Sequence, residues 1–258
     1  MDEIGIQAVA ASLSLVFVGL GLSVWLQLGL TRPIIEASIR AALQLGVVGV
    51  AFLFIFDNRF AHLWAWLWVL AMVTIASFVV RRRAPSIPGL APAMFGSTFG
   101  STGVALALLF GLGVFEREPV TIVVIAGITI GNVLPAAVLA AKQLDQQFKE
   151  QSGQVEALLA LGMDRRRAMM FIAPIAARTA LTGQIERTKV VGLIALPGAM
   201  TGLLLAGVPP VEAVMVQVVV MYLILGTAIM AVVTVVWIGA RQAFTPDLRL
   251  ADWAQPRG

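Results

Sequence analysis

The chain has 258 residues, of which 59% are hydrophobic and 12% charged, and its mean hydropathy is +0.93. Soluble domains carry about 25% charged residues, so this composition excludes an ordinary soluble protein and indicates an integral membrane protein. The net charge of +4 is modest and favours cytoplasmic anchoring over nucleic-acid binding. The absence of cysteine excludes disulfides, thiolate metal sites and cysteine nucleophiles.

Apolar runs of about 20 residues recur along the chain, and helices satisfy their own backbone hydrogen bonds in lipid. We therefore predict an all-α, polytopic membrane protein with about seven transmembrane helices, at 4–28, 34–56, 62–80, 90–113, 120–141, 188–206 and 212–238. These spans form a single transmembrane domain over residues 1–244, into which a charged cytoplasmic segment at 142–187 is inserted. Residues 245–258 contain Pro246 and Pro256 and are expected to form a frayed cytoplasmic tail.

Basic residues are distributed unequally over the expected loops. With the N-terminus outside and the C-terminus inside, Arg59 and Arg117 alone among the 18 Lys and Arg residues lie on the outer side. Because cytoplasmic loops collect basic residues, we predict this N-out, C-in orientation in the plasma (inner) membrane. Residues 169–185 are apolar but contain Pro174 and Arg178. They are expected to form an inner-leaflet helix that leads to the sixth span, and the alternative is an eighth span.

Several polar residues, prolines and glycines lie within the expected spans. Glu36, Arg40 and Gln44 are spaced four apart and share one helix face, either as a structural pair or as a wall of a transport pathway. The sixth span combines a proline with two glycines, which is typical of a break beside a pathway or of a plain kink. The candidate pathway or hinge residues are Glu36, Arg40, Gln44, Asn132, Pro197, Gly198, Met200, Thr201, Gly202 and Gln217.

No enzyme active site is indicated. The sequence contains no Gly-x-x-x-x-Gly-Lys-Ser/Thr, and none of its three lysines follows a glycine, so it has no P-loop for ATP phosphates. The single histidine, His62, is expected at an outer loop beside Trp64, and no pair of carboxylates lies deep in the spans. We therefore expect no catalytic residue, no metal-ligand set and no cofactor bound by this chain.

Residues 142–169 form a charged, hydrophilic segment between apolar spans. We predict a short amphipathic helix at Val155–Leu161 that ends at Gly162 and is followed by the arginine cluster 165–167. Glu156-Ala157-Leu158, three further residues and Gly162 resemble the cytoplasmic loop of ABC importer permeases, although Leu158 replaces an alanine of that pattern.

Other segments are similar to those of the FetB family, permeases of iron-export ABC transporters related to plant aluminium-tolerance proteins. These segments are Arg40–Gly49, Gly131-Asn132, the Glu156–Gly162 loop, Lys189–Gly202 and Leu205–Pro210. The resemblance covers residues 32 to 240, nearly the whole chain.

The resemblance implies a permease subunit that exports iron as a homodimer and pairs with a separate ATP-binding subunit holding ATP and Mg. Plant members are associated with nucleotide-sugar export, so a nucleotide sugar or another metal is the alternative cargo. The implied docking residues for the ATP-binding subunit are Glu156, Ala157, Leu158, Leu159, Gly162, Arg165, Arg166 and Arg167. A secondary transporter or channel, or a membrane anchor without a transport role, are the other functions left open.

Overall fold

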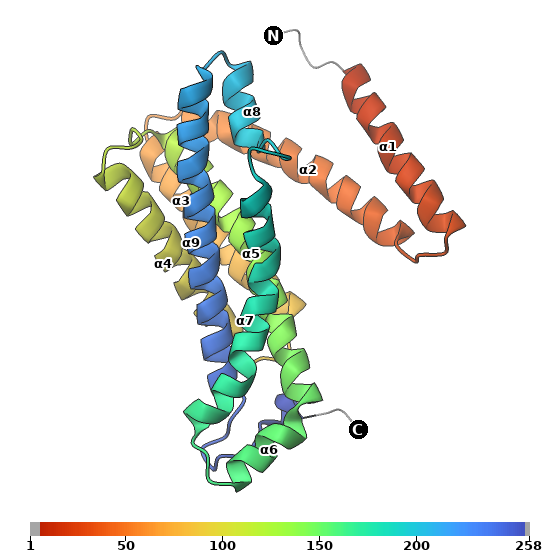
Figure 1. Cartoon of the computed structure of the whole chain (residues 1–258). Coiled ribbons are helices and arrows are strands. Elements are labelled where there is room, and N and C mark those ends of the chain that lie inside the picture. Colours follow the sequence, from red (N-terminus) through yellow and green to blue (C-terminus); the bar gives the residue numbers. More distant parts are fainter. Residues whose placement is uncertain (1–5, 256–258) are drawn as a thin grey trace. The chain divides into compact units, whose positions relative to one another are not determined.

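The computed structural model describes residues 6–255, and its regular structure in this range is helical (Figure 1). By contacts the chain divides into two units, Met1–Ala61 and His62–Gly258, which are described separately. The helices are α1 (Ile6–Trp25), α2 (Thr31–Phe56), α3 (Ala61–Arg83), α4 (Leu90–Gly111), α5 (Pro119–Glu150), α6 (Ser152–Ala160), α7 (Arg165–Val190), α8 (Gly198–Leu205) and α9 (Pro210–Gln242), followed by a 3₁₀ turn, η1 (Asp252–Ala254).

The first unit consists of α1 and α2. Both helices expose large apolar side chains, such as Phe17 at 65% and Leu53 at 74%. In water such surfaces would be costly, whereas acyl chains solvate them without penalty. The two helices are therefore suited to a lipid environment.

The second unit has its core where α5, α7 and α9 pack against one another, with α4 against α9. The C-terminal ends of α5 and α9 lie together, because the ring of Phe148 contacts the rings of Phe244 and Trp253 at centroid distances of 5.9 and 5.8 Å. Arg165, at the start of α7, donates a hydrogen bond to the carbonyl of Thr245, just beyond α9. The helix α7 therefore begins where α5 and α9 end and runs antiparallel to them.

A row of small side chains explains why α7 packs between two apolar helices. Buried residues recur at a spacing of four along its whole length, at Ala168, Ile172, Ala176, Ala180 and Gln184. Residues four apart lie on one face of a helix, and alanine allows neighbouring backbones to approach closely. One narrow face of α7 is thus fixed in the core, while its charged residues from Arg166 onward are exposed.

Five helices of the described part, α2, α3, α4, α5 and α9, are long and apolar enough to cross a membrane. They correspond to five of the seven expected spans, and α1 contains the shorter apolar segment Ala11–Trp25 at the place of the first. Residues 4 and 5 of that first span lie outside the described residues. The helix α5 continues past the expected end at 141 to Glu150, so part of the predicted charged segment extends it.

The expected sixth span at 188–206 is wrong as a continuous helix. The chain leaves α7 after Val190, forms a loop through Gly192 with φ +87°, and starts α8 only after Pro197. A positive φ and a proline both interrupt an α-helix, so the apolar run is divided between a loop and an eight-residue helix.

Residues 169–185 form the middle of α7, which contains Pro174 and packs on α5 and α9, and their expected place in the inner leaflet stays a prediction. The expectation for the C-terminal segment differs from the structure. The segment 245–255 is not frayed, because Leu250 and Ala254 are buried and the indole of Trp253 donates to the carbonyl of Gln242 at 3.2 Å. Residues 256–258, the end of the expected tail, lie outside the described residues.

Candidate functional site

A cavity of about 680 Å³ lies between α5, α7, α9 and the connection from α7 to α8. Its walls are mostly aliphatic, with a few polar side chains among them. The lining residues are Val124, Ile128, Asn132, Gln184, Arg187, Val190, Val191, Ala195, Pro197, Gly198, Ala199, Gln217, Val220, Met221 and Ile224.

The cavity extends from the end of α7 and the start of α8 into the bundle. The residues that α9 contributes, Gln217 to Ile224, begin seven residues into that helix. At about 1.5 Å per residue this corresponds to a depth of about 10 to 21 Å. On α5 the lining residues Val124 to Asn132 give a similar depth. Polar side chains at this level of an apolar bundle usually face its interior or a water-filled cavity.

Gln217 connects α8 to α9. Its side chain is 4% exposed, and its Oε1 accepts a hydrogen bond of 3.2 Å from the backbone N–H of Met200. The first turn of a helix has backbone N–H groups without partners inside the helix, and Gln217 satisfies one of them. The hydroxyl of Thr201 donates to the carbonyl of Pro197 at 3.1 Å, which strengthens the same turn.

Asn132 is the polar residue of α5 in the cavity wall. Its Nδ2 donates to the carbonyl of Ile128 at 2.8 Å, one turn back along the helix. Because this bond uses the amide nitrogen, the acceptor oxygen of Asn132 stays available to a ligand. Four of the ten predicted pathway or hinge residues, Asn132, Pro197, Gly198 and Gln217, thus line one cavity.

Two polar residues of the cavity, Gln184 and Arg187, were missed by sequence reasoning. Both belong to the last two turns of α7, which the sequence assigned to the cytoplasmic segment 142–187. The available signal was the spacing of four from Ala168 to Gln184, which predicts one buried face through the whole of 168–184. An apolar-run criterion cannot detect such a face, because charged residues interrupt the sequence of the helix.

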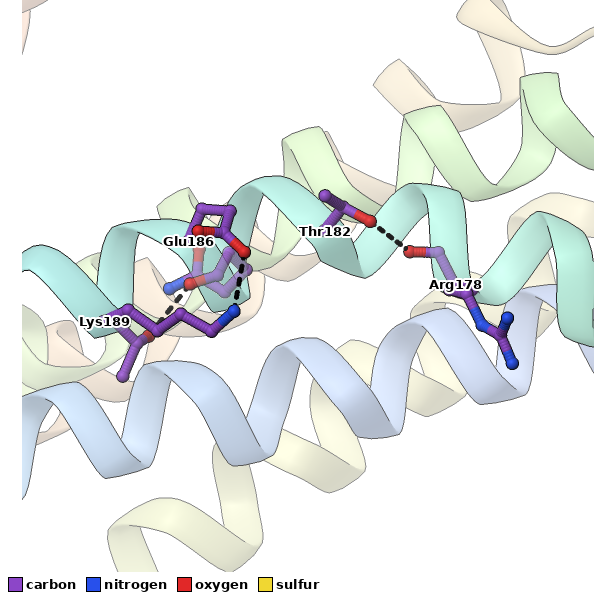
Figure 2. A network of polar contacts seen from close by, with 6 residues as sticks. Arg178, Thr182, Glu186 and Lys189 are labelled. Atoms are coloured by element: carbon purple, nitrogen blue, oxygen red, sulfur yellow. Dashed lines mark hydrogen bonds and ion pairs between the residues drawn. The ribbon is translucent and has the colours of Figure 1, made fainter.

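Four exposed residues of α7, Arg178, Thr182, Glu186 and Lys189, are labelled in Figure 2. The hydroxyl of Thr182 donates to the carbonyl of Arg178 at 2.8 Å, and Lys189 pairs with Glu186 at 2.8 Å between Nζ and Oε1. Both members of this ion pair are more than half exposed, so the pair contributes little to stability. Arg187, by contrast, forms no ion pair with any described residue.

The remaining predicted pathway residues lie elsewhere. Met200, Thr201 and Gly202 belong to α8 but do not line the cavity, and Met200 reaches it only through its backbone bond to Gln217. Glu36 and Arg40 form an ion pair of 2.6 Å on α2, in the other unit, and Gln44 follows on the same helix. The pairing of Arg40 with Glu36 is therefore confirmed.

The predicted short helix is α6, and it ends at the predicted glycine. Gly162 has a φ of +82°. Its backbone N–H donates a hydrogen bond to the carbonyl of Leu159, and the backbone N–H of Met163 donates to the carbonyl of Leu158. This pair of bonds is the Schellman motif, which closes a helix at a left-handed glycine. The next helix starts at once, because the carboxylate of Asp164 accepts from the backbone N–H of Arg167 at 2.7 Å.

One side of α6 packs on the protein and the other is open. Val155 is fully buried and Leu159 packs against the core, so Leu159 belongs to the inner side of the helix. The exposed side carries Glu156, Ala157 and Leu161, the last at 80% exposure. Arg166 and Arg167 are exposed beyond the turn, whereas Arg165 is engaged with the carbonyl of Thr245.

Within the described residues, no group of three or more His, Cys, Asp or Glu side chains could hold a metal ion. Among the described residues that line the cavity, none is an acid, a histidine or a cysteine. The expectation that the chain has no metal-ligand set stays a prediction.

Comparison with known proteins agrees with the resemblance. The family described as "Uncharacterised protein family (UPF0014)" matches residues 6–244. The chain is 35% identical to "UPF0014 membrane protein STAR2" of Oryza sativa subsp. japonica over 96% of this chain and 87% of the relative. It is 34% identical to "Protein ALUMINUM SENSITIVE 3" of Arabidopsis thaliana, over 93% of this chain and 88% of the relative.

A bacterial relative is similar over the same range. The chain is 30% identical to "Probable iron export permease protein FetB" of Escherichia coli (strain K12) over 92% of each protein. No solved structure matches the chain. The suspected kinship with the FetB family is confirmed by these relatives and by the family match. The chain therefore belongs to the UPF0014 family, and its long apolar helices make it a multi-pass membrane protein.

Proposed function

We propose that this chain is the permease subunit of an ABC transporter in the plasma membrane, with an iron-containing solute as its cargo. Two copies would form the membrane part, and a separate ATP-binding subunit would dock on the exposed side of α6. The name of the bacterial relative, a probable iron export permease, supports the choice of cargo. The lack of a P-loop in this sequence supports the need for an ATP-binding partner.

The observation that carries the proposal is that one helix joins α6 to the cavity. The helix α7 begins three residues after Gly162 and lines the cavity with its last two turns, through Gln184 and Arg187. With 26 residues it is about 39 Å long at about 1.5 Å per residue. A movement imposed on α6 by a bound partner would therefore be transmitted to the cavity by a single rigid element.

The mechanism needs two states of the cavity that differ in their contacts. ATP binding would bring the two partner subunits together and displace α6. The helix α7 would then shift between α5 and α9, on a row of alanines that tolerates small sliding movements. The loop around Gly192 would absorb the movement, because α8 is fixed to α9 by the bond from Met200 to Gln217.

The docking half of the proposal is tested by a matched pair of charge reversals. Glu156→Arg changes the exposed side of α6, and Glu116→Arg makes the same change in the exposed loop before α5, at its opposite end. We expect Glu156→Arg to reduce copurification of the ATP-binding subunit by about tenfold or more, as loss of a well-placed charge at an interface does. Glu116→Arg should leave copurification unchanged.

The transport half is tested with the purified complex in liposomes. We expect iron supplied together with a chelator to stimulate ATP hydrolysis, and Glu156→Arg to abolish the stimulation. Equal copurification of the two Glu→Arg variants would contradict docking on α6. Solute transport by the permease alone, driven by an ion gradient, would contradict the ABC assignment altogether.

A further inference from the structure

The chemistry of the cavity favours one sign of charge. Arg187 is the one charged side chain among its described lining residues, and none of these residues is an acid. The other polar groups are the amides of Asn132, Gln184 and Gln217. A solute that entered this cavity would therefore meet a guanidinium and three amides.

The side-chain groups left without partners are mainly hydrogen-bond donors. Gln184 is 8% exposed, and its amide has no hydrogen-bond partner among the described residues. Gln217 uses its oxygen to accept from Met200, which leaves its NH₂ group free. Arg187 makes no ion pair with any described residue, so its five N–H donors are also free.

Arg187 has no counter-charge among the described lining residues. It is an exposed residue three positions before the end of α7, and it lines the cavity together with Gln217 and Val220 of α9. Charged side chains within a membrane protein face water-filled cavities and find counter-charges, because lipid cannot solvate them. Glu186, the preceding residue, already pairs with Lys189 and is not among the lining residues, so it supplies no counter-charge to Arg187.

We infer that the cavity binds the anionic group of the cargo, a carboxylate or a phosphate, through Arg187 with the amides of Gln184 and Gln217. Guanidinium pairs with both groups in a two-pronged geometry, and amide donors add to it. The inference rests on the proposed transport function and narrows its cargo. Iron would travel as the anionic chelate of an organic acid or a phosphate compound and not as the bare cation.

The absence of metal ligands points in the same direction. Bare ferrous or ferric ions require several oxygen, nitrogen or sulfur ligands, and carboxylates or imidazoles usually supply them. The described cavity lining offers neutral amides and a cation, which repels a free metal ion. A chelate brings its own ligands and presents an outer surface of carboxylate or phosphate oxygens.

The test measures binding to the detergent-purified complex of permease and ATP-binding subunit by calorimetry. The probes are ferric citrate, citrate alone, pyrophosphate and ferrous ion alone. We expect at least one of the three anions to bind saturably, and ferrous ion alone not to. The anion that binds best identifies the source of the charge: iron chelate, free carboxylate or phosphate.

The variants are matched in charge. Arg187→Gln removes the cation of the cavity, and Lys189→Gln removes a neighbouring cation that is paired with Glu186 and does not line the cavity. We expect Arg187→Gln to weaken anion binding about ten- to hundredfold, as loss of a charged hydrogen-bonding group does. Arg187→Lys should recover part of the affinity, and Lys189→Gln should bind as the unchanged protein does.

The outcomes separate this inference from the proposed function. Saturable binding of ferrous ion that is unaffected by Arg187→Gln would overturn the anion site while leaving transport in place. Absence of binding by all three anions, in a complex that still copurifies and hydrolyses ATP, would also overturn it. Unchanged thermal unfolding of Arg187→Gln shows that a weakened affinity reflects the site and not misfolding.

Discussion

Gly162 lies in the turn that connects α6 to α7. Its φ of +82° is a conformation that side chains with a Cβ rarely adopt, while a Cβ built there would meet no atom within 4 Å. The cost of a substitution would therefore come from the backbone alone. Gly153, on α6, has an ordinary φ and equally open surroundings, so it separates the two causes.

We predict that Gly162→Ala destabilises the turn between α6 and α7 by about 1–2 kcal/mol, which is the cost of a left-handed conformation for a residue with a Cβ. Gly153→Ala should be neutral or slightly stabilising, since alanine is the better helix former. The rate of hydrogen exchange of the backbone amides in α6 measures the effect of each substitution. Equal protection of α6 in the two variants would show that the turn at Gly162 does not depend on glycine.

Single residues were predictable where a local rule determines them. Gly162 was identified because a glycine after an apolar helical run predicts a left-handed cap, and Asn132 and Gln217 because polar residues in apolar spans are exceptional. Arg187 lies in a charged stretch where nothing local distinguishes it from Lys189. Their difference, one lining the cavity and the other paired to Glu186, depends on the rotation of α7 in the folded protein.

At the scale of elements, α7 is held by packing rather than by its own hydrophobicity. Its buried face is narrow and built largely from alanine, and Ala176 in its middle is fully buried. Overpacking such a position forces a helix away from its neighbours. Thr179, less than one turn further on, is exposed.

We expect Ala176→Leu to cost about 1–3 kcal/mol of stability, as added methylenes in a filled core do. Thr179→Leu adds a similar side chain to the exposed face and should leave stability nearly unchanged. Thermal unfolding of the purified protein compares the two. A Tm for Ala176→Leu equal to that of Thr179→Leu would contradict the packing of α7 between α5 and α9.

The misassignment of the sixth span has the same physical cause. Hydropathy identifies long apolar runs such as those in α5 and α9, and it passes over a helix with one narrow apolar face. It also favoured 188–206, where an apolar composition conceals a left-handed glycine at 192 and a proline at 197. The composition of a segment shows that it is apolar, but it does not show where the helix is interrupted.

At the scale of the whole molecule, the prediction of seven crossings can be kept if α7 replaces 188–206 as the sixth. The loop and α8 would then lie toward the side where α9 begins. This assignment changes the side on which the end of α7 lies. With 188–206 as the span, Arg166 and Lys189 both lie inside, whereas with α7 as the span they lie on opposite sides.

The sequence makes this difference easy to measure, because it contains no cysteine and each introduced thiol is therefore unique. Arg166, Lys189 and Glu116 are all exposed side chains, so replacing each with cysteine should leave the fold unchanged. Labelling with a membrane-impermeant maleimide in intact cells reports thiols on the outer side. We expect Glu116→Cys and Lys189→Cys to be labelled in intact cells, and Arg166→Cys only after the membrane is opened. Protection of Lys189→Cys together with Arg166→Cys would restore the original sixth span. It would also change the side of the membrane on which Arg187 and the proposed anion site lie, so this topology experiment should precede the binding measurements.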